Sequence, residues 1–141
     1  DCTLADVAVS DFDALALPGG FETFGYYEDA YSPIVQEVLR QFAQAGKPIA
    51  AICVGALPLA KAGLLVGRRA TTYQLGEGRR RRQLAELGAH VIDQPVVEDG
   101  RFVTSSCPAT AVEVALRLLA AISSEANARR IRDLMGYSDA G

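Results

Sequence analysis

The chain has 141 residues, a length typical of one compact domain. Hydrophobic residues make up 50% and charged residues 22%, which excludes an intrinsically disordered or fibrous protein. The net charge of −3 argues against a protein that binds nucleic acid through bulk positive charge, and the longest apolar stretch, residues 48–60, is too short to cross a membrane. We therefore expect a single domain over residues 1–141 that binds no nucleic acid and does not cross a membrane.

Apolar segments alternate with helical patterns along the whole chain. In chain order, the expected elements are a strand (13–17), a helix that Ser32 and Pro33 begin and Gly46 ends, a strand (48–52), a helix (55–62), a strand (69–73), a helix (77–87), a strand (89–92), a hairpin (96–97 with 102–104) and two helices (109–122 and 124–135). This alternation predicts an α/β domain with a mainly parallel sheet.

The three cysteines, Cys2, Cys53 and Cys107, are widely spaced and belong to no CxxC pair or Cys/His cluster. We therefore expect no zinc or other metal site. Unpaired thiols are typical of a reducing compartment, so we expect a cytoplasmic protein.

Cys53 lies where the apolar strand 48–52 turns directly into a helix, and a glycine follows two residues later. This pattern is the cysteine counterpart of a nucleophile elbow, which projects a reactive side chain from the carboxyl edge of a sheet. We expect the N-terminus of the following helix to lower the pKa of the thiol. A buried structural cysteine is the alternative.

The turn Pro18-Gly19-Gly20 ends the strand 13–17. A diglycine can direct backbone amides toward a ligand, as an oxyanion hole requires, although an ordinary turn is the alternative. A nucleophile at one strand end and amide donors at another together indicate acyl or carbonyl chemistry.

Four sequence blocks, LPGG, GKPIAAICVGA, GLLVGRRATTY and VVEDGRFVTSSCPATAVEVALRLL, resemble the ThiJ/PfpI family of the class I glutamine-amidotransferase-like superfamily. The resemblance covers about residues 11–122. It implies a flavodoxin-like three-layer sandwich and a homodimer. The family's N-terminal strand–helix–strand unit, which carries a glutamate beside the cysteine, has no counterpart in the 141 residues. We expect an N-terminally incomplete domain or a sheet that another chain completes.

On this resemblance, Cys53 is the nucleophilic and oxidation-sensitive cysteine. The backbone amides of Gly20 and Val54 form the oxyanion hole, and Gly19 shapes the turn that carries one of them. Tyr73 is a further pocket candidate, because it stands where many members have a histidine after paired threonines. We therefore expect no Cys–His catalytic pair.

Glu22 and Cys107 are the remaining pocket candidates. Glu22 follows the diglycine and could approach the pocket. Cys107 follows the strand 102–104 and is expected at the same sheet edge as Cys53, either as a second redox thiol or as a packed loop cysteine. We expect His90, the only histidine, to be structural or on the surface.

Two clusters have both a functional and an ordinary interpretation. The arginine run 79–82 could bind an anion, a partner chain or nucleic acid, but we expect a solvated helix face with Glu77 and Glu86 as partial counter-charges. The tyrosines at 26, 27 and 31 could form the wall of a pocket or interface, or flank a helix.

The resemblance, together with the cysteine turn and the diglycine, implies a cofactor-free enzyme that acts on small reactive carbonyl compounds, such as 2-oxoaldehydes, in the manner of a glyoxalase III or deglycase. The Cys53 thiolate would add to the aldehyde, the two amides would hold the oxyanion, and a carboxylate would move the proton. An isonitrile hydratase would use the same groups. A non-enzymatic redox-sensing or chaperone-like protein with an oxidisable Cys53 is the other alternative.

Overall fold

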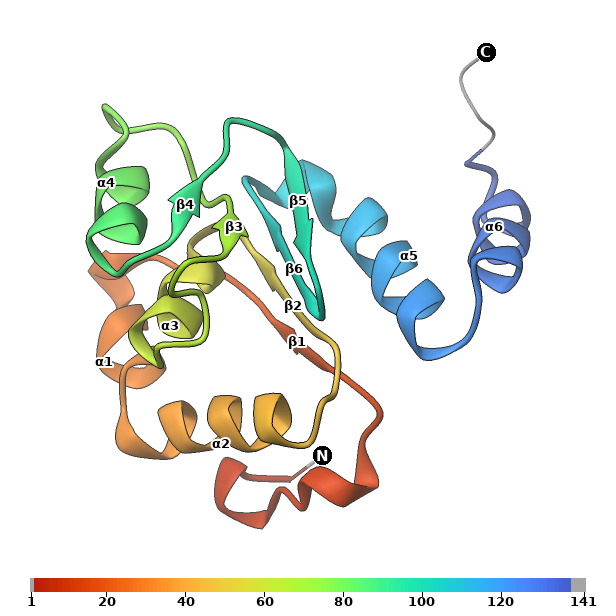
Figure 1. Cartoon of the computed structure of the whole chain (residues 1–141), viewed down its shortest axis with the longest axis horizontal. Helices are drawn as coiled ribbons and strands as arrows, with labels where there is room; N and C mark the ends of the chain where they lie inside the picture. The colour runs from red at the N-terminus through yellow and green to blue at the C-terminus, as the bar shows by residue number, and fades with distance from the viewer. Residues whose placement is uncertain (1, 138–141) are drawn as a thin grey trace.

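The computed structural model describes residues 2–137. Its main sheet contains four strands in the spatial order β1 (Leu15–Leu17), β2 (Ile49–Ile52), β6 (Phe102–Ser105) and β5 (Val96–Asp99) (Figure 1). The strands β1, β2 and β6 run parallel, and β5 pairs with β6 as an antiparallel hairpin. The predicted α/β fold with a mainly parallel sheet is therefore confirmed.

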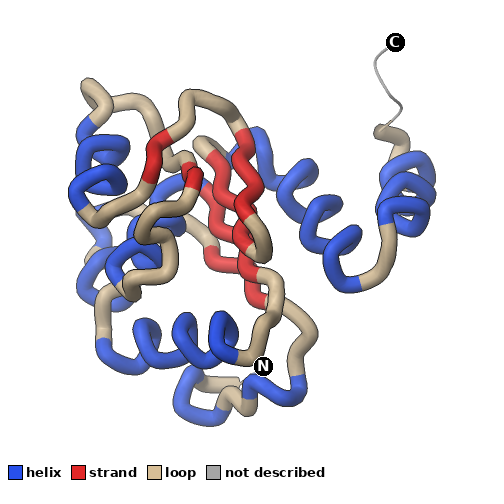
Figure 2. Tube along the Cα trace, in the orientation of Figure 1, coloured by secondary structure: helices blue, strands red, loops and turns tan. Residues whose placement is uncertain are grey.

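Helices lie between β1 and β2 and between β2 and the hairpin of β5 and β6 along the chain (Figure 2). The α-helices are α1 (Tyr26–Ala30), α2 (Pro33–Gln44), α3 (Ala56–Lys61), α4 (Arg79–Glu86), α5 (Ala111–Ile122) and α6 (Glu125–Leu134). Short 3-10 helices are η1 (Leu4–Asp6), η2 (Val9–Asp11), η3 (Glu22–Phe24), η4 (Cys53–Gly55) and η5 (Pro108–Thr110). The helix α2 starts at Pro33 as predicted, and the Ser124 hydroxyl caps α6 by accepting the Asn127 amide proton at 3.1 Å.

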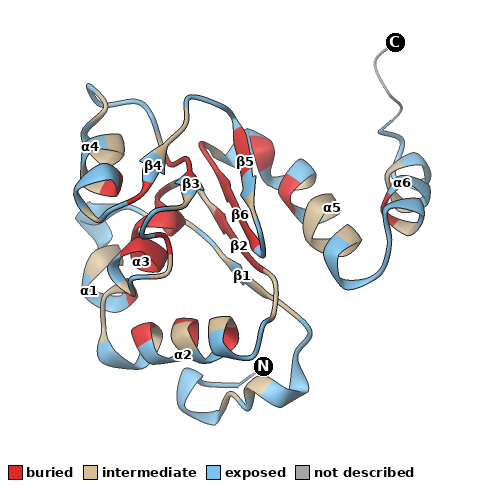
Figure 3. Ribbon diagram, in the orientation of Figure 1, coloured by how far each residue is buried: buried red, intermediate tan, exposed pale blue. Residues whose placement is uncertain are grey.

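The main sheet separates two hydrophobic cores. On one face, Ile49 and Ala51 of β2 pack in the larger core with residues of α2 and α3. On the other face, Ala50 of β2 packs with Val103 of β6 and Val114 of α5. Because β2 is buried on both faces, its sequence is continuously apolar instead of alternating. Figure 3 shows buried residues in β2, β6 and α3.

The predicted strands 69–73 and 89–92 do not join the main sheet. They shorten to β3 (Arg69–Ala70) and β4 (His90–Val91), which form a separate parallel pair. The reason lies in the hydrogen bonds of the buried threonines after β3. The Thr71 amide donates to the side-chain oxygen of Thr104 in β6 at 2.9 Å, so its partner is a side chain and not the backbone carbonyl of a paired strand.

The helix predicted from residue 77 begins two residues later, at Arg79. Gly76, Glu77 and Gly78 have φ angles of 68°, 56° and 70°, in the left-handed region that a right-handed helix cannot contain. No helix within residues 2–137 is both long enough and apolar enough to cross a membrane.

Candidate active site around Cys53

Cys53 directly follows β2 and is the first residue of η4, the 3-10 turn that leads into α3, as the sequence pattern predicted. Its φ angle is +59°, in the left-handed region that side chains other than glycine rarely adopt. This conformation costs about 1 kcal/mol or more at a residue with a Cβ atom. Strained residues of this kind cluster at active sites and ligand clamps. This backbone conformation makes Cys53 a candidate functional residue, and its half-buried side chain also packs against the larger core.

Two glycines allow the diglycine turn to lie against Cys53. A Cβ atom on Gly55 would come within 2.7 Å of the Leu17 carbonyl oxygen, so the start of α3 touches the end of β1. A Cβ atom on Gly19 would lie 3.1 Å from the Cβ of Cys53. The two strand ends that the sequence singled out are thus adjacent, and Gly19 lies directly beside the cysteine.

Thr72 holds the backbone of Cys53 in place. Its buried side-chain hydroxyl donates a 2.8 Å hydrogen bond to the Cys53 carbonyl oxygen. Sequence reasoning used the paired threonines only to locate Tyr73, and it missed this contact. Tyr73 itself is half-buried and packs against the larger core.

Replacing Thr72 with valine, which has nearly the same shape, removes this hydrogen bond and leaves the carbonyl of a strained residue without it. We expect the free energy of unfolding to fall by about 1–2 kcal/mol. Urea denaturation of the two proteins measures the difference. An unchanged denaturation midpoint would show that the bond does not support the turn.

The electrostatics of the Cys53 thiol differ from the prediction. Burial raises the pKa of this half-buried thiol above that of an ordinary cysteine, and the nearby Cys107 acts in the same direction. A hydrogen bond from the Val54 backbone amide and the charge of Arg80 oppose the rise without cancelling it. The expected lowering of the pKa was therefore wrong, because desolvation outweighs the amide and the cation.

Tyrosines of α1 lie near the thiol, and both Tyr26 and Tyr27 interact electrostatically with Cys53. The Tyr26 hydroxyl donates to the Pro18 carbonyl at 2.8 Å, which ties α1 to the diglycine turn. Burial raises the pKa of Tyr27 to about 12 and raises that of Tyr26 as well. Both phenols are therefore neutral at physiological pH, and both side chains are half-buried and pack against the larger core.

Arg80 is a site residue that sequence reasoning missed. Its side chain is 14% exposed, and its guanidinium lies over the Tyr27 ring at 4.7 Å from the centroid. It donates to the Glu22 carboxylate at 2.7 Å and to Gln83 at 2.9 Å. The arginine run 79–82 was visible in the sequence, but the run alone does not show which of its four arginines has a mostly buried side chain.

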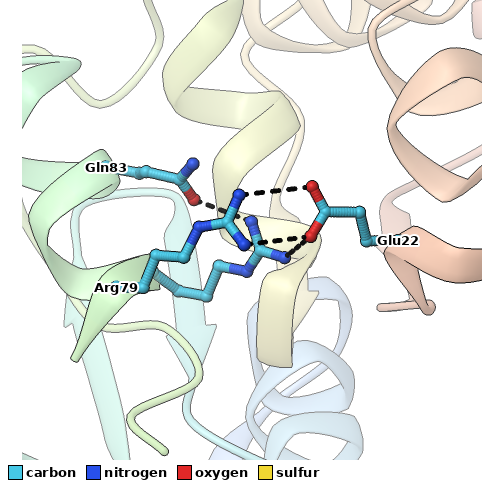
Figure 4. Close-up of polar contacts among 4 residues, drawn as sticks. Glu22, Arg79 and Gln83 are labelled. Atoms are coloured by element: carbon cyan, nitrogen blue, oxygen red, sulfur yellow. Dashed lines mark hydrogen bonds and ion pairs between the residues drawn. The ribbon is translucent and has the colours of Figure 1, made fainter. Parts of the chain in front are cut away.

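Glu22 is held by arginines of α4 (Figure 4). Arg79 donates to its carboxylate at 3.2 and 3.3 Å, beside the shorter bond from Arg80. The hydrogen bond from Arg80 is the main cause that holds the pKa of Glu22 below its usual range. The carboxylate is thus a weak base, which does not favour Glu22 as the proton-transferring group.

The counter-charges expected for the arginine run were also wrong. Glu22 pairs with the first two arginines, and Asp93 pairs with Arg81. Arg82 donates to the backbone carbonyl of Glu77, at 2.6 Å, and not to its carboxylate. The carboxylate partners, Glu22 and Asp93, come from other segments, whereas the prediction considered only neighbours along the helix.

Cys107 and His90 complete the candidates. Cys107 is half-buried after β6 and lies close enough to Cys53 to affect its titration. His90 is exposed in β4, as expected. Within residues 2–137, no group of three or more His, Cys, Asp or Glu residues is placed to hold a metal ion.

Since only the thiolate of Cys53 is nucleophilic, its alkylation by iodoacetamide should accelerate with pH through a pKa higher than that of an ordinary cysteine. Replacing Arg80 with methionine removes a charge that lowers this pKa, so the profile should move to higher pH. Mass spectrometry of the tryptic peptide 41–61 follows Cys53 alone. Arg79→Met, which also loses a Glu22 contact, is the matched control and should leave the profile in place. A shift of equal size in both variants would contradict the assignment of Arg80 to the site.

Comparison with known proteins agrees with this geometry. The model of the DJ-1/PfpI family matches residues 1–121. Deglycase PfpI of Pyrococcus furiosus is 39% identical over 110 residues, which cover 77% of this chain and 61% of that protein. Glutathione-independent glyoxalase DJR-1.2 of Caenorhabditis elegans is 32% identical over 119 residues, or 84% of this chain and 60% of that protein.

The crystal structure of Drosophila melanogaster DJ-1beta superposes with a TM-score of 0.82 at 32% identity, covering 96% of this chain and 70% of that one. The chain spans 61% and 60% of the length of these two curated relatives. The match of family model and fold, with the cysteine turn inside the matched region, establishes that the chain belongs to the DJ-1/PfpI family.

Proposed function

We propose that the protein is a cysteine-dependent enzyme that converts small reactive carbonyl compounds, as a deglycase or glyoxalase does, without a cofactor. The observation that carries the proposal is the strained backbone of Cys53, with a φ angle of +59°, at a strand-to-helix turn beside the diglycine. Relatives at 32–39% identity that are named deglycase and glyoxalase support the same chemistry.

In the proposed reaction, the Cys53 thiolate adds to the aldehyde carbon of a 2-oxoaldehyde. The former aldehyde oxygen becomes an oxyanion, for which the backbone amides of Gly20 and Val54 are the proposed donors. The Val54 amide already hydrogen-bonds the sulfur, so it lies beside the reacting atoms. A proton then moves from the former aldehyde carbon to the neighbouring carbon, giving a thioester of a 2-hydroxy acid. Water hydrolyses this thioester, releases the acid and restores the thiol.

The proton transfer requires a base. Glu22 is a poor candidate, because its ion pairs with Arg80 and Arg79 hold its pKa below the usual range. The resemblance places the base on the glutamate of the family's N-terminal strand–helix–strand unit. We propose that such a unit joins the open edge of β1, the outer strand of the main sheet, and completes the three-layer sandwich. An apolar groove of about 310 Å³ between β1 and α5, with Leu17 and Leu118 in its lining, supports this placement.

A Glu22→Gln variant tests whether the base is Glu22 or the glutamate of the N-terminal unit. A general base contributes about 10²–10⁴-fold to a rate, so turnover that falls by less than about tenfold indicates that Glu22 is not the base. We expect this small effect, measured as kcat with methylglyoxal. A loss of about 10²-fold or more with an intact fold would instead assign proton transfer to Glu22.

Formation of a 2-hydroxy acid from methylglyoxal, without glutathione or added metal, tests the proposed activity directly. The product is measured by chromatography, with a Cys53→Ser variant as the blank. We expect product from the parent protein only. Product formation at equal rates in both proteins, or none from a folded parent protein, would contradict the proposal.

We further propose that the protein acts as a homodimer, as the resemblance implies. Phe21 and Phe24 follow Gly20 and are 72% and 85% exposed, and their rings contact edge to face at 6.2 Å. Large apolar side chains so exposed beside a site are typical of surfaces that a partner covers. Light scattering should give about twice the 15.0 kDa mass of the chain, and a monomer at every concentration would contradict the dimer.

A further inference from the structure

Cys53 and Cys107 follow the ends of two neighbouring strands. β2 and β6 pair in parallel, and their last residues, Ile52 and Ser105, are partners in the register. Cys53 comes one residue after Ile52, and Cys107 comes two residues after Ser105. Neighbouring strands are about 4.8 Å apart, and a disulfide needs two Cα atoms about 4.4–6.8 Å apart. The register therefore places the two cysteines at the same carboxyl edge of the sheet, just beyond the ends of two adjacent strands.

Contacts around both cysteines fix their main chains. The Cys53 carbonyl accepts the bond from Thr72, and the Cys107 carbonyl accepts bonds from the Thr110 amide at 3.1 Å and the Thr110 hydroxyl at 2.7 Å. Each thiol is half-buried, so a small oxidant can reach it. The charge of Cys107 also acts on the titration of Cys53, which agrees with their close approach.

Cys2 is placed differently. It is exposed and directly precedes the segment of η1, which lies toward the end of the sheet where β1 and β2 begin (Figure 1). Cys53 and Cys107 lie beyond the opposite, carboxyl ends of their strands. Cys2 therefore serves as an internal control when the oxidation of Cys53 and Cys107 is measured.

We propose that Cys53 and Cys107 form a reversible intramolecular disulfide when a hydroperoxide oxidises Cys53. The Cys53 thiolate attacks one peroxide oxygen, the O–O bond breaks, and hydroxide or alkoxide leaves while Cys53 becomes a sulfenic acid. The Cys107 thiol then attacks this sulfur, the S–O bond breaks, and water leaves as the disulfide forms. The peroxide gains the two electrons that the thiol pair loses.

The disulfide would switch the site off and protect it. It occupies the sulfur on which the proposed carbonyl chemistry depends, and a dithiol reductant restores both thiols. It also competes with further oxidation of the sulfenic acid to a sulfinic acid, which is irreversible in most proteins. The inference rests on the strand register and does not depend on which substrate, if any, Cys53 converts.

Intact mass after treatment with a small excess of hydrogen peroxide, with free thiols then blocked by N-ethylmaleimide, tests the proposal. We expect a loss of about 2 Da and one blocked thiol, Cys2, instead of three. Trypsin without reduction should give the peptide 41–61 joined to the peptide 102–117, and dithiothreitol should separate them. A gain of about 32 Da on peptide 41–61 while Cys107 stays free to react would overturn the disulfide. A cross-link between two chains would overturn its intramolecular nature.

Three single variants assign the roles. Cys107→Ser should lose the cross-link and gain about 32 Da at Cys53 under the same treatment. Cys53→Ser should leave Cys107 unoxidised, and Cys2→Ser, the matched control, should behave as the parent protein. Cys107→Ala repeats the first test with a second side chain, and circular dichroism confirms that each variant folds. Equal Cys53 oxidation with and without Cys107 would contradict its role, whether or not the protein turns over methylglyoxal.

Discussion

Replacing Cys53 with glycine should abolish turnover of 2-oxoaldehydes and at the same time stabilise the fold. The thiolate forms the covalent intermediate in the proposed reaction, so we expect kcat to fall at least about 10³-fold. The φ angle of +59° strains a residue that has a Cβ atom, and glycine adopts this conformation without that cost. The free energy of unfolding should therefore rise by about 1 kcal/mol.

The matched control is Cys53→Ser, which keeps the Cβ atom and the strain but removes the sulfur. It should lose turnover to the same extent without becoming more stable than the parent protein. Urea denaturation and the methylglyoxal assay measure the two effects on the same samples. If the glycine variant is no more stable than the serine variant, the backbone at Cys53 is not strained, and the main structural support for a functional cysteine is lost.

Replacing Gly55 with alanine should destabilise the protein by about 3 kcal/mol, at the upper end of the usual cost of overpacking. The added Cβ would lie 2.7 Å from the Leu17 carbonyl oxygen and 3.0 Å from that of Pro18. Both neighbours are backbone atoms, which cannot move aside as a flexible side chain can. The start of α3 must separate from the end of β1, and this displaces the turn that carries Cys53.

Gly63→Ala, at the other end of α3, is the matched control for this substitution. Gly63 has a φ angle of +80°, and nothing lies within 4 Å of its Cβ position, so alanine there meets strain but no clash. We expect a loss of about 1 kcal/mol from that strain. Chemical denaturation of both variants measures the difference, and equal losses at the two positions would refute the close approach at Gly55. Turnover should fall in Gly55→Ala and stay near the parental value in Gly63→Ala.

Patterns along the chain were sufficient to predict most of the fold. The apolar run that became β2, the Ser32-Pro33 start of α2 and the hairpin of β5 and β6 are local signals, and the structure contains all three. The same holds for the position of Cys53, because a strand that ends at a cysteine and continues into a helix is visible in a few residues. The four sequence blocks that resemble the family predicted the order of the strands and helices over most of the chain.

Local patterns failed where hydrogen bonds come from distant residues. The strands 69–73 and 89–92 have suitable composition, but Thr71 and Thr72 bond to Thr104 and Cys53, and the strands shorten to two residues each. The arginine run 79–82 likewise found its counter-charges in other segments. A sequence pattern shows which residues are neighbours along the chain. It does not show which distant residues become neighbours in the folded protein.

The sequence by itself determined the fold class, the family and the cysteine at the carboxyl edge of the sheet, because local periodicity and motif order encode them. Only the tertiary structure decided the state of that cysteine. Its left-handed backbone, the burial that raises its pKa, Arg80 over the Tyr27 ring and the approach of Cys107 all arise from contacts between distant segments. Desolvation and charge act through space, so they depend on packing that no local pattern specifies.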